Sequence, residues 1–372
     1  MRVLFLIFHG FAPNNGISKK ILYQVDALKA CGNDVHLCYM NEDGSKKRMV
    51  DDTIIADYGN GRISKIKKRI DFSSVENYCI DNSIEFLYIR SNNNANPFII
   101  RMIRKIKSTG TRVVMEIPTY PYDTEYVSQG LGKQIYVDRL FRRLQAAQLD
   151  AIVTFSNHDT IYGQRTIKIS NGIDFDKIRI KTSVHDTTKS LNLIGVAEIH
   201  QWHGFDRLVK GLADYYSLQR EYKVYFHLVG YFFSRREENE FRQYVNENGL
   251  ASYVIIHGKK HEEELDAVFD LCDFGVGSLG RHRVGIKNIK TLKNREYAAR
   301  GIPFIYSEDD NDFDKMPYVL KAPADETPID ICSIIYFYQH LSISPKEIRD
   351  SIKNLSWESQ MRHVITSLFK IK

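Results

Sequence analysis

The residues best suited to chemistry gather at the start of one predicted helix. The helix spans 292–300, and the cations Lys290, Lys293 and Arg295 lie close to the carboxylate of Glu296. The amino end of a helix carries partial positive charge, so it attracts anions together with these cations. A nucleotide diphosphate needs such cations, and a carboxylate can accept hydrogen bonds from both ribose hydroxyls. The alternative is a solvated, charged helix start.

A loop near the amino terminus offers a second candidate contact. Residues 9–18 connect the first predicted strand to the first helix, and Gly16 allows close approach to the backbone there. Free N–H groups at a helix start favour a phosphate or a sugar hydroxyl. The loop lacks the G-x-G-x-x-G spacing, which disfavours a dinucleotide site. An ordinary turn is the competing interpretation.

Two short patterns imitate metal sites. His200 and His203 stand one helical turn apart, which is too few ligands for zinc. Asp310 and Asp312 lie in a very acidic stretch that indicates a solvated turn. We therefore expect neither a metal nor another cofactor.

A loop rich in tyrosine and proline follows the strand predicted at 112–116. Tyr120 and Tyr122 could stack on sugar rings, and the carboxylate of Asp123 could bind sugar hydroxyls. Glu116 and Asp123 are also the candidate general bases if a transfer reaction inverts configuration. A stiff surface loop without a ligand is the alternative.

The elements that must position these groups follow from alternating patterns. Short apolar runs alternate with helical patterns in both halves, as in parallel sheets covered on both faces. Strands are expected at 3–8, 34–38, 86–89, 112–116, 151–155, 191–196, 224–229, 254–256, 274–276 and 304–305. The length of 372 residues suits two domains. The fold class is α/β, with two Rossmann-like doubly wound domains facing a cleft.

Composition narrows the function classes. The five cysteines form no C-x-x-C pair, which indicates reduced thiols in a cytoplasmic protein. Residues 1–170 hold 24 Lys and Arg against 17 Asp and Glu, whereas the remainder holds 28 against 29. This asymmetry favours an anionic partner. Nucleic acid ranks low because no nucleic-acid module is present.

Basic helical segments in the first half suggest where an anionic partner could lie. They include 64–69, 97–107 and 133–148. In the last segment we expect one face to lie inward and the basic residues to lie outward. The inward set is Val137, Leu140, Phe141 and Leu144, and the outward set is Arg139, Arg142 and Arg143. Peripheral contact with an anionic inner membrane leaflet is one interpretation. Solvated helix faces are the default.

Three separated motifs together resemble one enzyme family. They are Asn171-Gly172-Ile-Asp174, Lys293-x-x-Glu296-Tyr-Ala-Ala-x-Gly301-x-Pro303 and a closing helix that begins Ser356-Trp357-Glu358. Their order and spacing resemble GT-B glycosyltransferases of the family 4 type, especially bacterial enzymes of capsular, exopolysaccharide and O-antigen synthesis. The resemblance implies an acceptor-binding domain at 1–173, with the helix 357–372 packed back on it. It also implies a nucleotide-sugar-binding domain at 174–356.

The resemblance also implies roles for single residues. Glu296 would hold the donor ribose, and Lys293 would lie near the diphosphate or the transferred sugar. The expected donor contacts are Gly16, Asn171, Gly172, His203, Lys290, Lys293, Arg295 and Glu296. The expected acceptor contacts are Asn15, Tyr120, Tyr122 and Asp123. The candidate catalytic residues are Glu296, Lys293, Glu116 and Asp123.

The sequence departs from the family pattern at three positions. Asn288 replaces the first of two family glutamates, and Glu198 and His203 stand where an Arg and a Lys often clamp the diphosphate. We expect a cytoplasmic, metal-independent transferase at the inner membrane face. It would move a hexosyl-type sugar from a nucleotide-sugar to a lipid-linked or oligosaccharide acceptor, with retention implied by the family. A non-catalytic protein that binds glycans or partners, and a sugar-nucleotide epimerase or hydrolase, remain open alternatives.

Overall fold

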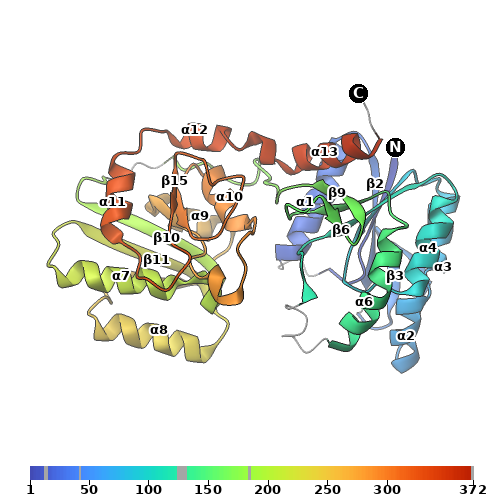
Figure 1. Ribbon diagram of the computed structural model, residues 1–372, viewed down its shortest axis with the longest axis horizontal. Coiled ribbons are helices and arrows are strands. Elements are labelled where there is room, and N and C mark those ends of the chain that lie inside the picture. The colour runs from blue at the N-terminus through green and yellow to red at the C-terminus, as the bar shows by residue number, and fades with distance from the viewer. Residues whose placement is uncertain (12–15, 42, 124–131, 183–185, 370–372) are drawn as a thin grey trace. The chain divides into compact units, whose positions relative to one another are not determined.

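The chain forms two compact units, shown in Figure 1. The computed structural model describes residues 1–11, 16–41, 43–123, 132–182 and 186–369. Unit 1 comprises Met1–Ser170 and Trp357–Lys372, and unit 2 comprises Asn171–Ser356. The division therefore falls after Ser170, close to the polar stretch that follows it in the sequence.

Unit 1 contains a mostly parallel sheet with the strand order β4-β3-β2-β1-β5-β6-β7-β9-β8. Its strands are β1 (Arg2–Leu6), β2 (Asp34–Asn41), β3 (Lys47–Val50), β4 (Thr53–Asp57), β5 (Phe86–Arg90), β6 (Arg112–Ile117), β7 (Ala151–Thr154), β8 (Thr160–Ile161) and β9 (Gln164–Lys168). Strands β3, β4 and β8 pair in the antiparallel sense. Apolar cores cover the sheet on both faces, which explains the continuous apolar runs of its central strands.

The helices of unit 1 are α1 (Gly16–Ala30), α2 (Arg62–Ile70), α3 (Ser73–Asp81), α4 (Pro97–Lys107), α6 (Gly132–Ala146) and α13 (Trp357–Phe369). Helix α4 starts where the sequence predicts because the Asn96 side chain accepts hydrogen bonds from the N–H groups of Phe98 and Ile99. Pro97 suits the first helical turn. Helix α13 packs against α1 and buries Trp357 in the core of unit 1.

Unit 2 contains a fully parallel sheet with the strand order β12-β11-β10-β13-β14-β15. Its strands are β10 (Ser190–Ile199), β11 (Lys223–Phe232), β12 (Val254–Gly258), β13 (Phe274–Val276), β14 (Phe304–Tyr306) and β15 (Val319–Lys321). Its helices are η1 (Gln201–His203), α7 (Phe205–Ser217), α8 (Arg235–Glu247), α9 (Glu262–Leu271), η2 (Arg281–Val284), α10 (Leu292–Ala299), α11 (Ile331–Gln339), α12 (Pro345–Asp350) and η3 (Lys353–Leu355). Two Rossmann-like units confirm the expected fold class.

A β-hairpin was not expected in unit 1. Strands β3 and β4 occupy a region whose charged residues indicate a surface connection. The charged run forms a strand because Arg48, in β3, is fully buried. Its guanidinium donates to the Tyr58 hydroxyl at 3.2 Å and to the Lys68 carbonyl at 3.1 Å. These partners, with the nearby Phe72 ring, let a charged residue occupy a buried strand position.

The orientation expected for α6 is wrong. Val137, Leu140 and Leu144 are exposed, whereas Asp138 is buried on the opposite side. Asp138 accepts hydrogen bonds from the Ala95 N–H at 3.0 Å and from the Tyr122 hydroxyl at 2.7 Å. These bonds satisfy the carboxylate inside the unit, so Asp138 can share the inward face of α6 with the buried Ile135 and Ala146.

Among the described residues, none of the helices is long and apolar enough to cross a bilayer.

Candidate functional site

Three adjacent strands of unit 2 end at the same edge of its sheet. Strand β10 leads into η1, β13 leads into the loop that contains η2, and β14 leads into the acidic segment 307–314. The pairing of β10 with β13 and of β13 with β14 makes these loops neighbours. Helix α10 also starts here. Open α/β sheets bind ligands beyond the carboxyl ends of their strands.

Several side chains at this edge carry buried polar atoms without a hydrogen-bond partner among the described residues. We call four of them the buried polar cluster: the Ser278 hydroxyl, the Lys293 Nζ, the Asn294 amide and the Glu308 carboxylate. The Thr291 hydroxyl, directly before α10, is a further example. Ser278 is tied to the β14 loop because its carbonyl accepts the Ser307 N–H at 3.0 Å. Buried polar groups are almost always paired in proteins. The cluster therefore suits a polar ligand that supplies the missing partners.

Lys293 and Glu308 provide the opposite charges of the cluster. Part of Lys293 is exposed, but its Nζ is buried and lies 5.9 Å from the centre of the Phe205 ring. Burial lowers the pKa of Lys293 well below its ordinary value, the Arg281 charge acts in the same direction, and Glu308 opposes them. Burial raises the pKa of Glu308. The ammonium is thus held in a site where an anionic ligand would stabilise it.

His203 contributes a neutral group rather than a cation. Its Nδ1 accepts the backbone N–H of His200 at 3.0 Å, and its ring stacks on Phe205. Burial and the charges of Lys293 and Arg281 lower the pKa of His203 far below its ordinary range. A neutral ring that accepts at Nδ1 carries its proton on Nε2, so His203 can donate a hydrogen bond but supplies no positive charge.

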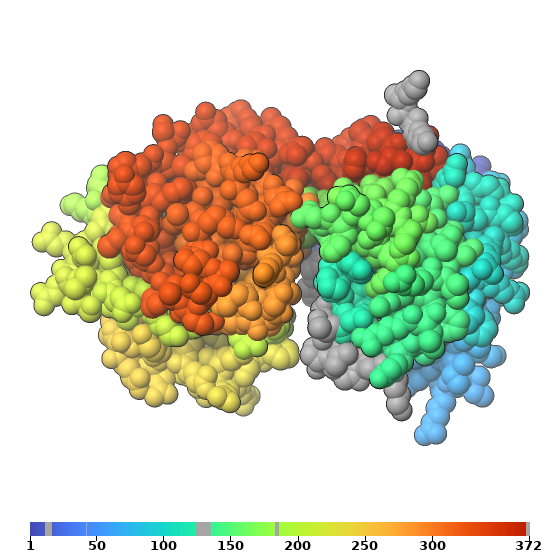
Figure 2. All heavy atoms as spheres, in the orientation of Figure 1, coloured from blue at the N-terminus to red at the C-terminus, as the bar shows by residue number. Residues whose placement is uncertain are grey.

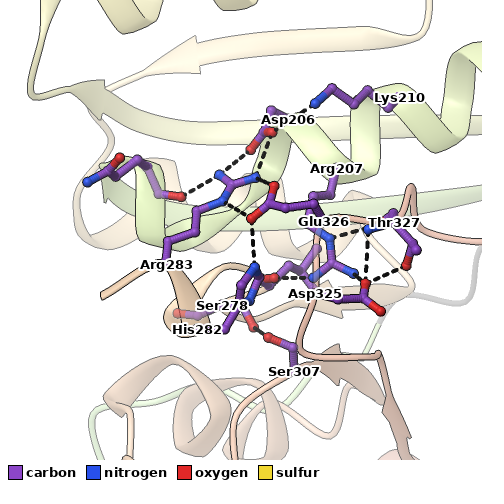
Figure 3. Close-up of polar contacts among 12 residues, drawn as sticks. Asp206, Arg207, Lys210, Ser278, His282, Arg283, Ser307, Asp325, Glu326 and Thr327 are labelled. Carbon is purple, nitrogen blue, oxygen red and sulfur yellow. Dashed lines mark hydrogen bonds and ion pairs between the residues drawn. The ribbon is translucent and has the colours of Figure 1, made fainter. Parts of the chain in front are cut away.

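An ion-pair network fixes the η2 loop against α7 (Figure 3). The Arg283 guanidinium pairs with Asp206 at 2.8 and 2.9 Å, and its Nε donates to Glu326 at 2.8 Å. Glu326 also accepts from His282 at 2.7 Å. The buried Arg207 donates to the carbonyl oxygens of Leu279 and Thr327. These bonds hold the segment between Ser278 and Val284 in place without using the buried polar cluster.

Gly204 permits the close approach of two loops. Its φ is +63°, and a Cβ atom built there would lie 2.6 Å from the carbonyl carbon of Leu279. Any side chain would therefore both strain the backbone and push the β13 loop away from η1.

Glu296 lies one turn after Lys293 on α10. Its Oε1 accepts from Arg300 at 3.0 and 3.1 Å, and Arg300 also pairs with Asp266 at 2.6 Å. The side chain is 28% exposed, and its Oε2 makes no hydrogen bond with a described residue. One carboxylate oxygen therefore remains available to a ligand. Residues three apart on a helix share a face, so the Glu296 side chain lies beside that of Lys293.

Two other expected donor contacts serve the acidic loop instead. Arg295 is fully buried and pairs with Asp310 at 2.7 and 3.2 Å and with Asp312. Lys290 pairs with Asp312 at 3.5 Å. The acidic segment is consequently not the solvated turn that its composition indicates. Its carboxylates neutralise cations that the sequence assigned to a ligand.

The remaining donor candidates are Asn171, Gly172 and Gly16. The Asn171 amide donates to the Lys290 carbonyl at 2.6 Å, and its buried Oδ1 has no partner among the described residues. Gly172 follows in a buried position. Gly16 is the first residue of α1. Asn15 lies outside the described residues.

The candidate base and acceptor residues of unit 1 mostly bind other residues of the same unit. Glu116 is fully buried because β6 continues to Ile117, and it accepts from Tyr88 and Gln24 at 2.6 Å. Although burial opposes ionisation, the charges of Arg90 and Lys20 hold the pKa of Glu116 below its ordinary value. A carboxylate without exposed surface cannot take a proton from a substrate in this arrangement.

The tyrosine loop is likewise turned inward. Tyr122 is buried and donates to Asp138. Asp123 pairs with Arg139 at 3.0 Å and with Arg142 at 2.7 Å. The partly buried Tyr120 meets Tyr162 edge to face with ring centres 5.5 Å apart. Of the expected acceptor contacts that the structure describes, Tyr120 and Asp123 keep exposed surface.

Sequence reasoning missed Ser278, Asn294 and Glu308. The run Gly277-Ser278-Leu279-Gly280 directly after a predicted strand was a usable signal for a ligand loop. Nothing in the acidic run distinguishes the buried Glu308 from exposed neighbours. Among the described residues no group of three or more His, Cys, Asp or Glu side chains is placed to hold a metal ion.

Comparisons with known proteins give a match in structure. No protein-family model matches the sequence, and the search of curated proteins finds no match. A glycosyltransferase from Rickettsia africae superimposes with a TM-score of 0.64 at 12% sequence identity. Sucrose-phosphate synthase from Thermosynechococcus elongatus superimposes with a TM-score of 0.62 at 14% sequence identity. Each of these two matches covers 100% of this chain and 99% of the other chain. HepE from Anabaena, in complex with UDP and glucose, gives 0.57 at 12% over 100% of both chains. The chain therefore has the two-unit GT-B fold of these enzymes.

Proposed function

We propose that this protein is a glycosyltransferase that moves a sugar from a nucleotide-sugar to a saccharide hydroxyl. The observation that carries the proposal is the buried polar cluster at the strand ends of unit 2. Its lysine, carboxylate, amide and hydroxyl match a ligand that offers phosphates and hydroxyl groups. The UDP and glucose bound to HepE, which has the same fold, support this class of ligand.

Each candidate donor contact of unit 2 has a distinct role in this proposal. Lys293 neutralises the diphosphate with help from Arg281 and the amino end of α10. Glu296 accepts a ribose hydroxyl through Oε2 while Arg300 holds Oε1. His203 donates a neutral hydrogen bond from Nε2. When the bond from the sugar to the diphosphate breaks, charge develops on the departing phosphate oxygen, and fixed cations stabilise it without reorganisation.

Retention of configuration is part of the proposal. Of the two carboxylates considered as the base of an inverting reaction, Glu116 is fully buried and Asp123 is shared by two arginines. These pairings support the family expectation that a donor phosphate oxygen assists deprotonation of the acceptor. Identification of the product anomer by NMR would test it, and inversion would contradict it.

The acceptor side rests on the family resemblance. We propose a saccharide acceptor carried on a lipid, bound by unit 1 at the cytoplasmic membrane face during synthesis of a bacterial surface polysaccharide. The partly exposed ring of Tyr120, which packs edge to face on Tyr162, supports a saccharide contact on unit 1. Transfer of radiolabelled sugar to membrane lipid extracts, followed by chromatography, would test the acceptor class.

A binding protein without catalysis is favoured by one observation. Glu198 occupies the position of a family arginine and pairs with His200 at 3.4 Å, so that position adds negative charge. Such a protein would bind nucleotides weakly or not at all. An epimerase or hydrolase would instead consume the donor without any acceptor.

Calorimetry with UDP, GDP, ADP, CMP and their sugars tests the proposal. We expect the wild type to select one nucleotide and Glu296→Ala to lose most of that affinity. Glu263→Ala removes an exposed carboxylate of α9 in the same unit and should bind as the wild type does. Absence of binding by the folded wild type to every nucleotide would overturn the proposed function.

A further inference from the structure

Helix α2 of unit 1 turns its apolar side chains toward solvent. Its sequence is Arg62-Ile-Ser-Lys-Ile-Lys-Lys-Arg-Ile70. Ile63 is 70% exposed, Ile66 is 59% exposed and Ile70 is 38% exposed. Surface helices of globular proteins ordinarily bury such a stripe. In Figure 2 the light-blue atoms of this part of the chain project from unit 1.

The opposite side of α2 is the attached side, and it is polar. Ser64 is buried and donates to the Gly61 carbonyl at 2.8 Å. The Lys68 carbonyl accepts from the buried Arg48 at 3.1 Å. The bond from Arg48 thus ties this side of α2 to strand β3, whereas Ile63 and Ile66 keep most of their surface exposed.

The cations of α2 border the isoleucine stripe. With 3.6 residues per turn, Ile63, Ile66 and Ile70 form one face, with Lys67 on one side of it and Arg62 and Arg69 on the other. The first turn contains no acidic residue. Among the described residues, no carboxylate forms an ion pair with Arg62, Lys67 or Arg69. An apolar stripe bordered by cations is the pattern of a helix that lies in a lipid interface.

We propose that α2 docks unit 1 onto an anionic phospholipid bilayer, with the isoleucine stripe in the interface and the cations at the headgroups. Charge complementarity selects this partner, because Lys and Arg side chains near an anionic membrane surface favour binding to it. A nucleic acid would use the cations but would gain nothing from three exposed isoleucines. The proposal goes beyond the transfer reaction and does not depend on the donor site.

Vesicle co-sedimentation of the full chain tests the docking surface. Vesicles of phosphatidylcholine alone are compared with vesicles that also contain phosphatidylglycerol, in low and in physiological salt. We expect the wild type to bind the anionic vesicles about ten-fold more tightly or better, with weakening at higher salt. Equal binding to both vesicles, or no binding to either, would overturn the proposal.

Two pairs of variants separate the stripe from the cations. Ile63→Ser with Ile66→Ser is matched by Leu218→Ser with Leu271→Ser, which are 65% and 56% exposed on unit 2. Lys67→Gln with Arg69→Gln is matched by Lys29→Gln with Lys189→Gln, which removes the same charge from other exposed positions. Each α2 pair should lose about ten-fold or more in vesicle affinity, and each control should lose less than about two-fold.

Several outcomes would contradict insertion of α2. If vesicle binding depends on the α2 cations but not on its isoleucines, the helix is adsorbed by charge alone, as it would be on a nucleic acid. That result would reject insertion of the isoleucine stripe. Equal losses in the control variants would reject α2 as the site. Nucleotide affinity measured without vesicles should be unchanged in all four variants, so failure of the docking surface is distinguishable from failure of the donor site.

Discussion

Lys293→Met is expected to stabilise the protein while it abolishes tight nucleotide binding. The Lys293 Nζ is buried without a hydrogen-bond partner among the described residues, and burial lowers its pKa to about 7. The unfolded chain keeps a lysine pKa near 10.5. The folded protein without ligand therefore holds a group that would be charged in water, and methionine of similar length removes this cost.

The magnitude follows from the pKa difference. At pH 7 the cost of holding Lys293 is about 4 kcal/mol if the group is treated alone. Removing its charge also takes away one of the two cations that favour ionisation of the buried Glu308, so that Arg281 alone remains. We therefore expect a net gain of about 1–2 kcal/mol, or about 2–8 °C in Tm. Because the folded pKa is depressed, the gain should be largest at or below pH 7 and should shrink as pH rises toward 10.5.

Nucleotide binding should change in the opposite direction. Loss of a buried cation that faces a diphosphate costs about 2–4 kcal/mol, which corresponds to about 30- to 1000-fold in Kd. Thermal unfolding and calorimetry on the same samples measure both effects. Lys315→Met, an exposed lysine of unit 2, is the control and should change neither quantity. A Lys293→Met protein that melts no higher than wild type and binds nucleotide equally well would refute the reasoning.

Three further predictions concern the same unit. Binding of a nucleotide diphosphate should take up protons near pH 7 and weaken as pH rises above about 7, because the lowered pKa of Lys293 must rise when the ammonium meets phosphate. Calorimetry in buffers of different ionisation enthalpy measures the proton uptake. Binding without proton uptake would contradict this prediction. Arg295→Met should lower the free energy of unfolding by about 3–5 kcal/mol, because Asp310 is left buried without its partner. The control Arg242→Met breaks only an exposed ion pair and should cost less than about 1 kcal/mol in denaturant titration. Equal losses in the two variants would contradict a special role of the buried pair. Gly204→Ala should lower the free energy of unfolding by about 2–4 kcal/mol and weaken nucleotide binding. The control is Gly249→Ala, which should cost about 1 kcal/mol because Gly249 has a similar φ of +65° but open space around it. Similar losses in both variants would show that the contact with Leu279 is unimportant.

The sequence predicts the fold well because local and tertiary preferences agree in most elements. Helix α4 has a side-chain cap and a proline at its start, and β13 is a short apolar run between polar neighbours, so both bounds match the expectation. The β3–β4 hairpin was missed because Arg48 is buried only through partners that lie far away in the sequence. The face of α6 was reversed for a similar reason, since Asp138 finds its partners in other segments.

The site was only partly predictable for the same physical reason. The sequence located α10 and His203, because cations at a helix start and a histidine after a strand are local signals. It could not show that Arg295 would be neutralised by Asp310 or that Glu308 would be buried, because both depend on how the β14 loop folds over α10. Charge alone does not separate a ligand contact from an internal ion pair.

A crystal structure of the protein with the nucleotide diphosphate that binds best would test the central claim most directly. The account predicts phosphate oxygens within hydrogen-bond distance of the Lys293 Nζ and a ribose hydroxyl on the free Oε2 of Glu296. It also predicts ligand or ordered-water partners for Ser278, Asn294 and Glu308. A diphosphate bound elsewhere on the chain, with these buried groups unchanged, would contradict the assignment of the donor site to unit 2.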